Sequence, residues 1–377
     1  MKITRSFKIQ SLILAAALST GLGFVSPVSA QERYYILDTN TKELTALGSL
    51  GGYTYARGIN DAGQVVGTSQ TAAGNFHAFI TGPNGVGMRD LGTLDGDFSE
   101  AHGINKAGQV VGWSDTAGVT HSFITGPNGV GMRDLGTLGG NYSQAYGIND
   151  VGQVVGWSST ASGAEHAFIT GPNGGSMRDL GTLGGLDSLA TGINDTGQVV
   201  GESRAVGGIF HAFITGPNGE GMTDLGTLGG NYSQAYGIND VGQVVGWSIT
   251  ASGAEHAFIT GPNGGSMRDL GTLGGLDSLA NGINDTGQVV GESRAVGGIF
   301  HAFITGPNGE GMTDLNSLVG LPAETILHRA LDINNAGQVI VLATPFVPGI
   351  PEPRTYALML AGLILVGLMA GRKRLPA

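Results

Sequence analysis

Residues 141–185 read NYSQAYGINDVGQVVGWSSTASGAEHAFITGPNGGSMRDLGTLGG, and close copies of this unit recur along most of the chain. The triplet Gly-Ile-Asn marks each copy, at spacings of 44 or 45 residues and a last spacing of 50. The copies of the triplet begin at Gly58, Gly103, Gly147, Gly192, Gly237, Gly282 and, in degenerate form, Asp332. A fixed period of roughly 20–50 residues is typical of solenoids, propellers and related arrays.

A second anchor, His-Ala-Phe or His-Ser-Phe, recurs in the same phase. It begins at His77, His121, His166, His211, His256 and His301. Residues 33–35, which lie 44 residues before His77, occupy the missing first position. Residues 134–225 and 224–315 are identical except at two positions, Ser159 against Ile249 and Thr191 against Asn281. Because the duplicated block is two whole units long, the unit is also expected to be the structural module.

Each unit contains four short runs that favour β-structure. In the quoted copy these runs are 144–148, 153–158, 166–170 and 177–180. Asn-Asp-x-Gly and Gly-Pro-Asn-Gly separate them, and both are turn sequences because Pro presets φ while Asn and Gly tolerate positive φ. Only Pro322–Arg329 could hold a helical period. Four strands in about 45 residues match one propeller blade.

A single glycine-rich sheet of this size cannot bury enough apolar surface to be stable alone, so its neighbours must cover it. Seven anchors therefore predict an all-β, seven-bladed β-propeller over residues 31–344. The array begins in a third strand, Tyr34–Leu37, and ends after a second strand, Gln338–Ala343. We expect these halves to pair as one composite blade that closes the ring and removes exposed edges. An open β-solenoid is the alternative, but it would need caps that the sequence does not show.

The N-terminal residues 1–30 have the pattern of a secretory signal peptide. Three basic residues lie within the first eight positions, an apolar run covers 12–25, and Val28-Ser29-Ala30 forms a small-x-small cleavage pattern. Cleavage is expected after Ala30.

The C-terminal end carries three features in a fixed order. A linker, 345–354, contains Pro351-Glu352-Pro353, and an uncharged span, 355–371, follows it. As a helix the span would be about 25 Å long, at the short limit for a bilayer. The tail 372–377 opens with a basic cluster, which predicts a cytoplasmic end; the cluster is Arg372, Lys373 and Arg374.

This order resembles the PEP-CTERM sorting signal of Gram-negative bacteria. The resemblance implies recognition by an exosortase-type membrane enzyme after export, removal of the tail, and delivery to the cell surface or matrix. A permanent C-terminal transmembrane anchor is the alternative.

Composition excludes several classes of function. The chain of 377 residues has no cysteine, which excludes a disulfide scaffold, a thiol nucleophile and a thiolate metal site. Residues 31–349 hold 11 Lys and Arg against 28 Asp and Glu, a formal charge of −17. Such an acidic domain is not expected to bind nucleic acid, and anionic polymers would need bridging cations.

The repeated His-Ala-Phe sequence resembles the HAF extracellular repeat family, and the resemblance spans residues 33–343. That family has no assigned activity, so the resemblance implies an exported location and a repeat architecture rather than a reaction. The two degenerate copies, 33–35 and 332–334, stand where a closure seam would fall.

Repeated polar residues are the first candidates for a site. The six anchor histidines would lie in different blades, so we expect structural or surface roles for them. The Asn-Asp-x-Gly aspartates are interpreted as turn residues, because one such loop offers too few oxygens for calcium; they are Asp61, Asp150, Asp195, Asp240 and Asp285. The fourth-strand aspartates are interpreted as exposed edge charges; they are Asp90, Asp134, Asp179, Asp224, Asp269 and Asp314.

Trp113, Trp157 and Trp247 share one position in the second strand, where other units have Thr68, Glu202 and Glu292. We expect these indoles to pack between blades, with contact to carbohydrate as the weaker alternative. The sequence has no phosphate-binding loop and no nucleophile elbow. No cofactor is predicted; calcium remains open, although no motif supports it.

Near-identical units disfavour the single asymmetric cluster that catalysis requires. The sequence therefore predicts a non-enzymatic, exported surface or matrix protein that binds polysaccharide or protein partners through propeller loops. The sorting signal implies a link to biofilm and exopolysaccharide, with export machinery and an exosortase-type enzyme as partners. The alternatives are a secreted carbohydrate-active enzyme with carboxylates on one propeller face, and a matrix spacer.

Overall fold

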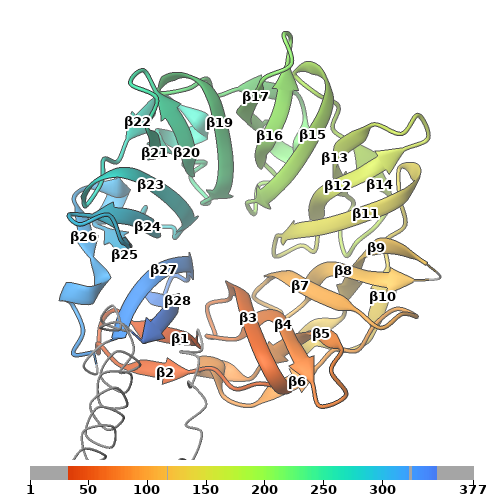
Figure 1. Cartoon of the computed structure of the whole chain (residues 1–377). Coiled ribbons are helices and arrows are strands. Elements are labelled where there is room, and N and C mark those ends of the chain that lie inside the picture. The colour runs from red at the N-terminus through yellow and green to blue at the C-terminus, as the bar shows by residue number, and fades with distance from the viewer. Residues whose placement is uncertain (1–32, 117, 322–324, 346–377) are drawn as a thin grey trace, which may run out of the picture. The chain divides into compact units, whose positions relative to one another are not determined.

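The computed structural model describes residues 33–116, 118–321 and 325–345, which form seven four-stranded antiparallel sheets. The sheets stand as blades around a central axis and follow one another in chain order (Figure 1). The predicted seven-bladed β-propeller is therefore confirmed, and the solenoid alternative is wrong.

Each blade has an inner strand beside the axis and a second strand paired with it. The inner strands are β3 (Gly51–Ile59), β7 (Ser99–Ile104), β11 (Gly139–Ile148), β15 (Gly184–Ile193), β19 (Gly229–Ile238), β23 (Gly274–Ile283) and β27 (Thr325–Ile333). The second strands are β4 (Val65–Thr71), β8 (Val110–Thr116), β12 (Val154–Thr160), β16 (Val199–Ala205), β20 (Val244–Thr250), β24 (Val289–Ala295) and β28 (Gln338–Pro345).

Two further strands complete each blade on the outside. The third strands are β1 (Arg33–Asp38), β5 (Phe76–Thr81), β9 (Val119–Thr125), β13 (Glu165–Thr170), β17 (Phe210–Thr215), β21 (Glu255–Thr260) and β25 (Phe300–Thr305). The short fourth strands are β2 (Leu44–Ala46), β6 (Met88–Asp90), β10 (Met132–Asp134), β14 (Met177–Asp179), β18 (Met222–Asp224), β22 (Met267–Asp269) and β26 (Met312–Asp314). The 3₁₀ turns are η1 (Pro83–Gly85), η2 (Pro127–Gly129), η3 (Pro217–Gly219), η4 (Pro262–Gly264), η5 (Pro307–Gly309) and η6 (Leu315–Ser317).

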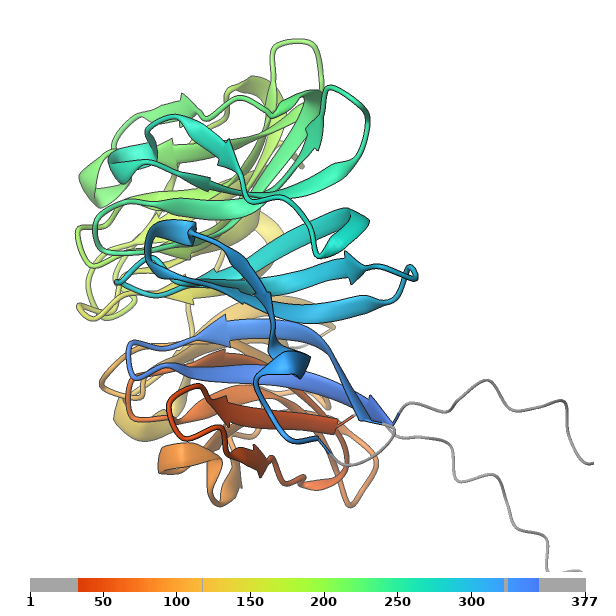
Figure 2. The same cartoon turned by 90° about the vertical axis from the view of Figure 1, so that its left-hand side faces the viewer.

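The closing blade combines both ends of the array, in the order β2-β1-β28-β27. β1 pairs with β28 over six residues, from Arg33 opposite Ala343 to Asp38 opposite Gln338. This is the composite blade that the phase of the repeats predicts. The start of β1 and the end of β28 lie on the same side of the ring (Figure 2).

The helical period suggested for Pro322–Arg329 is wrong from Thr325 onward, where β27 begins. Leu327, Ala330 and Ile333 are buried at intervals of three residues, which imitates a helix. The interval arises because β27 shifts register against β28 twice, between Leu327 and Arg329 and again between Ala330 and Asp332. Each shift adds one residue to the period of two that a strand normally has.

The hydrophobic core lies between blades. In one interface Phe258, Val244 and Ala235 of one blade pack against Val200, Ala212 and Ile214 of the preceding blade. The anchor phenylalanine is fully buried in six blades, as Phe79, Phe123, Phe168, Phe213, Phe258 and Phe303. Burying one such side chain contributes about 1.5–3 kcal/mol. Since every blade needs a neighbour to cover its phenylalanine, the blades depend on one another for stability.

The predicted signal peptide, residues 1–30, and the C-terminal candidates all lie outside the described residues. The latter comprise the Pro351-Glu352-Pro353 motif, the span 355–371 and the basic cluster Arg372, Lys373 and Arg374. Within the described ranges, no helix has the length and apolar character to cross a membrane.

The close approach of the second strand to the inner strand of a blade gives a stability prediction. A Cβ on Gly246 would lie 1.9 Å from the Gln234 carbonyl oxygen and 2.8 Å from the Ala235 Cα, both in the backbone of β19. We expect Gly246→Ala to cost at least about 3 kcal/mol, since the backbone of a packed ring cannot move away. Gly320→Ala is the control, because a Cβ there meets no atom within 4 Å. Thermal unfolding of both variants tests this; equal melting temperatures would contradict the packing.

Candidate functional site

Every inner strand carries a β-bulge at the same step. In β11 the register shifts between Ala145 and Gly147, which leaves Tyr146 as the additional residue. The other six inner strands shift at the equivalent position. A bulge re-aims a side chain, and all seven bulged residues line one cavity on the axis. They are Arg57, His102, Tyr146, Thr191, Tyr236, Asn281 and Leu331.

This cavity, here called the axial chamber, has a volume of about 670 Å³. That is within the range of roughly 300–1,000 Å³ typical of ligand pockets. The bulged residues occupy the variable position of the repeated sequence Ala-x-Gly-Ile-Asn. The chamber wall therefore carries six residue types at seven equivalent positions, although the frame that holds it is nearly uniform.

The two arginines at the chamber are each paired with a glutamate. The Arg57 Nη2 lies 2.9 Å from Glu100 Oε1, and the Arg329 Nε lies 2.8 Å from Glu292 Oε2. His102 is neutral, because burial first and the Arg57 charge second lower its pKa to about 3. Within the described part of the chain, its Nε2 has no hydrogen-bond partner.

The tryptophan candidates are half-buried, and two of them support the chamber wall. Trp247 Nε1 donates to Gln234 Oε1 and to the Tyr236 hydroxyl, each at 3.2 Å. Its ring stacks on Tyr232, with centroids 5.0 Å apart. Trp113 stacks in the same way on Phe98, at 4.9 Å, and Trp157 hydrogen-bonds the Tyr146 hydroxyl. All three indoles make these contacts within their own blade, which corrects the expectation that they pack between blades.

A ring of isoleucines borders the chamber on the side where the inner strands end. All seven line a second axial cavity, and all except Ile333 also line the chamber; they are Ile59, Ile104, Ile148, Ile193, Ile238, Ile283 and Ile333. We call them the isoleucine collar.

The next residue in each copy is an asparagine, and the seven asparagines form a closed ring of hydrogen bonds. Each Nδ2 donates to the carbonyl oxygen of the asparagine in the next blade, at 2.9–3.5 Å. The link from Asn334 to Asn60 closes the ring at 2.9 Å. Each Oδ1 also accepts the backbone N–H four residues on, as Asn239 does from Gln243 at 2.9 Å. The asparagine therefore stabilises both its own turn and the contact between blades.

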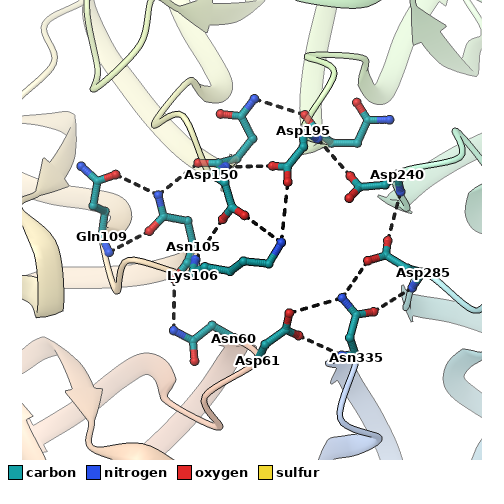
Figure 3. A network of polar contacts seen from close by, with 12 residues as sticks. Asn60, Asp61, Asn105, Lys106, Gln109, Asp150, Asp195, Asp240, Asp285 and Asn335 are labelled. Atoms are coloured by element: carbon teal, nitrogen blue, oxygen red, sulfur yellow. Dashed lines mark hydrogen bonds and ion pairs between the residues drawn. The ribbon is translucent and has the colours of Figure 1, made fainter.

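The residues that follow the asparagines line the second axial cavity, and we call this group the acidic mouth (Figure 3). Its members are Asp61, Lys106, Asp150, Asp195, Asp240, Asp285 and Asn335. Six of the seven backbone N–H groups donate to the side-chain oxygen of the next member at 2.9–3.2 Å. The seventh link would need Lys106 as acceptor, and an ammonium group has no acceptor atom.

These aspartates lie in the turns as expected, but the turn is only part of their role. The asparagine makes the turn, and the aspartate joins two blades. Each loop taken alone offers one aspartate, whereas the ring brings the five aspartates together at the axis. In the described segments, no three acidic or histidine side chains are placed to hold a metal ion.

Charge at the acidic mouth is unevenly compensated. Lys106 Nζ lies 2.8 Å from Asp150 Oδ2 and 3.7 Å from Asp195 Oδ2. Burial opposes ionisation of Asp150, but the hydrogen bonds and charge of Lys106 prevail and lower its pKa. Burial raises the pKa of Asp195, and the charges of Asp150 and Asp240 add to this.

The anchor histidines stay apart, each on its own blade. Each Nδ1 contacts the fourth-strand aspartate of the same blade at 2.7–3.0 Å. The aspartates also accept a backbone N–H, as Asp90 does from Gly92 at 2.7 Å. Their interpretation as simple edge charges is therefore corrected: they are partly exposed, but they tie the fourth strand to the third.

No protein-family model and no curated protein matches the chain. Solved propellers resemble it in fold. The β-propeller domain of the Trilobed protease from Pyrococcus furiosus has a TM-score of 0.52 and 11% identity, over 78% of this chain and 92% of that one. A putative TolB from Agrobacterium tumefaciens has a TM-score of 0.50 and 10% identity, over 84% and 99%.

A puromycin hydrolase mutant complexed with PGG has a TM-score of 0.51 and 12% identity, and the match covers 83% of this chain. This chain matches 56% of the hydrolase, little more than half of its length. At such identities the three likenesses establish the propeller architecture and nothing about activity.

Asp332 stands in the chamber wall where the other six copies have glycine, and it gives a pH prediction. It accepts the backbone N–H groups of Ile59 and Ile333, at 3.1 and 2.9 Å. Burial outweighs these bonds and raises its pKa to about 6, from 3.8. The folded state thus holds the proton more tightly than the unfolded chain. Below the unfolded pKa, Asp332 is protonated in both states and does not change the free energy of unfolding. As pH rises from there to about 6, the free energy of unfolding falls, and above that pH the loss stays constant.

We therefore expect Asp332→Asn to gain stability relative to the native chain as pH rises from 4 to 7, and no further gain above. The gain is at most roughly 3 kcal/mol, and water in the chamber reduces it. Urea unfolding at pH 4.5, 5.5, 6.5 and 7.5 measures the difference, with Asp95→Asn at an exposed site as control. A difference that stays constant with pH would contradict the assignment.

Proposed function

We propose that this protein is a non-enzymatic, exported surface or matrix protein whose propeller binds an extracellular polysaccharide or protein at the axial chamber. One observation carries the proposal: seven copies of a nearly constant frame each direct one variable side chain into the same cavity. Packing alone would favour one residue type at this position. A wall of Arg, His, Tyr, Thr, Asn and Leu instead supplies the varied contacts that recognition of an asymmetric ligand needs.

The chamber chemistry supports binding over catalysis. Glu292 in the wall is tied to Arg329, and Glu100 beside the chamber is tied to Arg57. Asp332, the other wall carboxylate, has both oxygens bonded to backbone N–H groups. Each of these carboxylates is thus held by contacts within the protein. A binding protein can use such pairs as fixed walls.

Export and sorting are proposed from the sequence alone. The cleavage pattern at Ala30, the Pro351-Glu352-Pro353 motif, the span 355–371 and the basic cluster 372–374 support secretion followed by exosortase-type processing. The described ends Arg33 and Ala343 are paired neighbours. A C-terminal attachment would therefore hold the ring by the face at which its inner strands begin.

The acidic mouth favours one second candidate, a secreted carbohydrate-active enzyme. Asp150 and Asp195 share Lys106, and their pKa values are displaced in opposite directions. Such a split is how a pair of carboxylates divides acid and base roles. In both residues, however, one side-chain oxygen already accepts a backbone N–H of the preceding blade.

The binding proposal predicts retention of the full chain on immobilised extracellular polysaccharide, with no release of reducing sugar. The assay is run with and without calcium, and with Asp150→Asn plus Asp195→Asn as a matched pair of variants. Sugar release that these two substitutions abolish would replace the proposal by the enzyme candidate. Absence of retention under both conditions would leave a protein partner or a spacer.

The sorting proposal predicts a mature chain that starts at Gln31 and lacks the residues from 355 onward. Fractionation of the producing cells followed by mass spectrometry of both chain ends tests this. Substitution of Pro351, Glu352 and Pro353 by alanine should retain the protein in the membrane fraction. An intact tail on wild-type protein in the inner membrane would overturn the proposal.

A further inference from the structure

We infer that the axial chamber recognises a neutral, polyhydroxylated ring, that is, the terminal sugar unit of a neutral saccharide. This inference rests on the proposed binding function and names the ligand class and its subsite. The first argument is charge. The charged side chains lining the chamber include Arg57, which is bonded to Glu100, and the pair Glu292 and Arg329. An anionic ligand would have to break one of these pairs to be compensated. A cationic ligand would have to compete for the wall residue Asp332, whose two carboxylate oxygens already accept backbone N–H groups, whereas a neutral ligand leaves all of these contacts in place.

The second argument is the supply of hydrogen-bonding groups. Gln234 Oε1 receives two donors, the Tyr236 hydroxyl at 2.9 Å and Trp247 Nε1 at 3.2 Å. Only an oxygen can accept, so these donors fix the amide orientation and leave the Nε2 amino group as a donor. Asn281 Nδ2 donates to Ala330 O at 2.8 Å, which leaves its Oδ1 as an acceptor. Donors and acceptors held in fixed positions suit hydroxyl groups, which both donate and accept.

The third argument is the apolar surface of the wall. Leu189 and Leu279 line the chamber beside the Tyr146 and Tyr236 rings. The C–H face of a sugar ring needs such a surface, while its hydroxyl edge needs the amides. A wall of this mixed kind accommodates both at once.

The isoleucine collar determines which part of a saccharide enters. It lies between the chamber and the acidic mouth, and Ile59, Ile283 and Ile333 in it are at most 9% exposed. The other four collar residues are half-buried, so a chain entering from the chamber side meets a ring of apolar side chains instead of a polar passage. A cavity of about 670 Å³ is large enough to hold a terminal sugar unit. We conclude that the end of a saccharide is bound and its interior is not threaded.

The duplicated block supplies a variant that separates binding from folding. Thr191 is the twin of Asn281, and its hydroxyl donates to the Ala235 carbonyl at 2.9 Å. Ala235 and Ala330 hold the same position of the repeated unit, so Asn281→Thr is expected to keep the contact between blades while it removes the amide oxygen. The other position that differs between the copies gives the control, Ile249→Ser, because Ile249 does not line the chamber. Both substitutions install residues that the same chain already tolerates at the equivalent site.

The experiment titrates the full chain with methyl glycosides of glucose, galactose and mannose, and with their linear oligomers of two to four units. Glucuronic acid and glucosamine serve as charged comparators. Tryptophan fluorescence is the readout, since Trp247 hydrogen-bonds the chamber-lining Gln234. We expect at least one neutral series to bind at least tenfold more tightly than both charged sugars. Asn281→Thr should weaken this binding about tenfold, because one hydrogen bond to the ligand is lost, and should leave the melting temperature unchanged. Ile249→Ser should leave the binding unchanged.

The length series separates two sources of the same chemistry. Affinity that stops rising at the second unit supports a polysaccharide end, and binding of single units alone supports a free sugar. Equal or tighter binding of a charged sugar, or an Asn281→Thr variant that binds as wild type, overturns the inference. If the chain is retained on polysaccharide but binds none of these sugars, the neutral-sugar inference fails and the proposed binding of polysaccharide survives. If the chain binds neither polysaccharide nor these sugars, the inference and the polysaccharide form of the proposed function both fail.

Discussion

Closure of the ring is the constraint on which the other features depend. β1 and β28 come from opposite ends of the described chain and pair over six residues. Only with this pairing in place can Asn334 donate to Asn60 and complete the ring of seven asparagine hydrogen bonds. The chamber takes its lining from all seven blades, so it exists only when the ring is closed. Backbone pairing at the seam and amide pairing at the axis thus stabilise the same state.

The architecture could be predicted from the sequence because it depends on the number of repeats and on the point of the repeat at which the array begins and ends. Seven anchors indicated seven blades, and the half units at Tyr34–Leu37 and Gln338–Ala343 indicated the composite blade. The site could not be predicted in the same way. The variable residue before Gly147 is visible in the sequence, but only the bulge directs Tyr146 to the axis. Likewise Asp150 and Asp195 are 45 residues apart, and only the ring places them next to each other.

The structure separates the residues that build the ring from those that give it chemistry. Ala, Gly, Ile and Asn of the repeated sequence make the bulge, the collar and the hydrogen-bonded ring. The bulged residue can differ from blade to blade where the replacement keeps the contact with the next blade. Thr191 and Asn281 illustrate this, because both donate to the carbonyl of an equivalent alanine in the next blade. A new contact with a ligand can therefore arise without a new fold.

The contact between blades is directional, since each asparagine donates forward and accepts from behind. A head-to-tail contact of this type has no intrinsic end; it stops only where the last member meets the first. Here that meeting is the edge-to-edge pairing of β1 with β28. If the two strands part, each becomes a free edge that fits the same strand of another copy. Partially opened rings would therefore pair the β1 of one copy with the β28 of another and form strand-swapped chains. Opening of the seam is thus the step that separates the folded monomer from a polymer of the same protein.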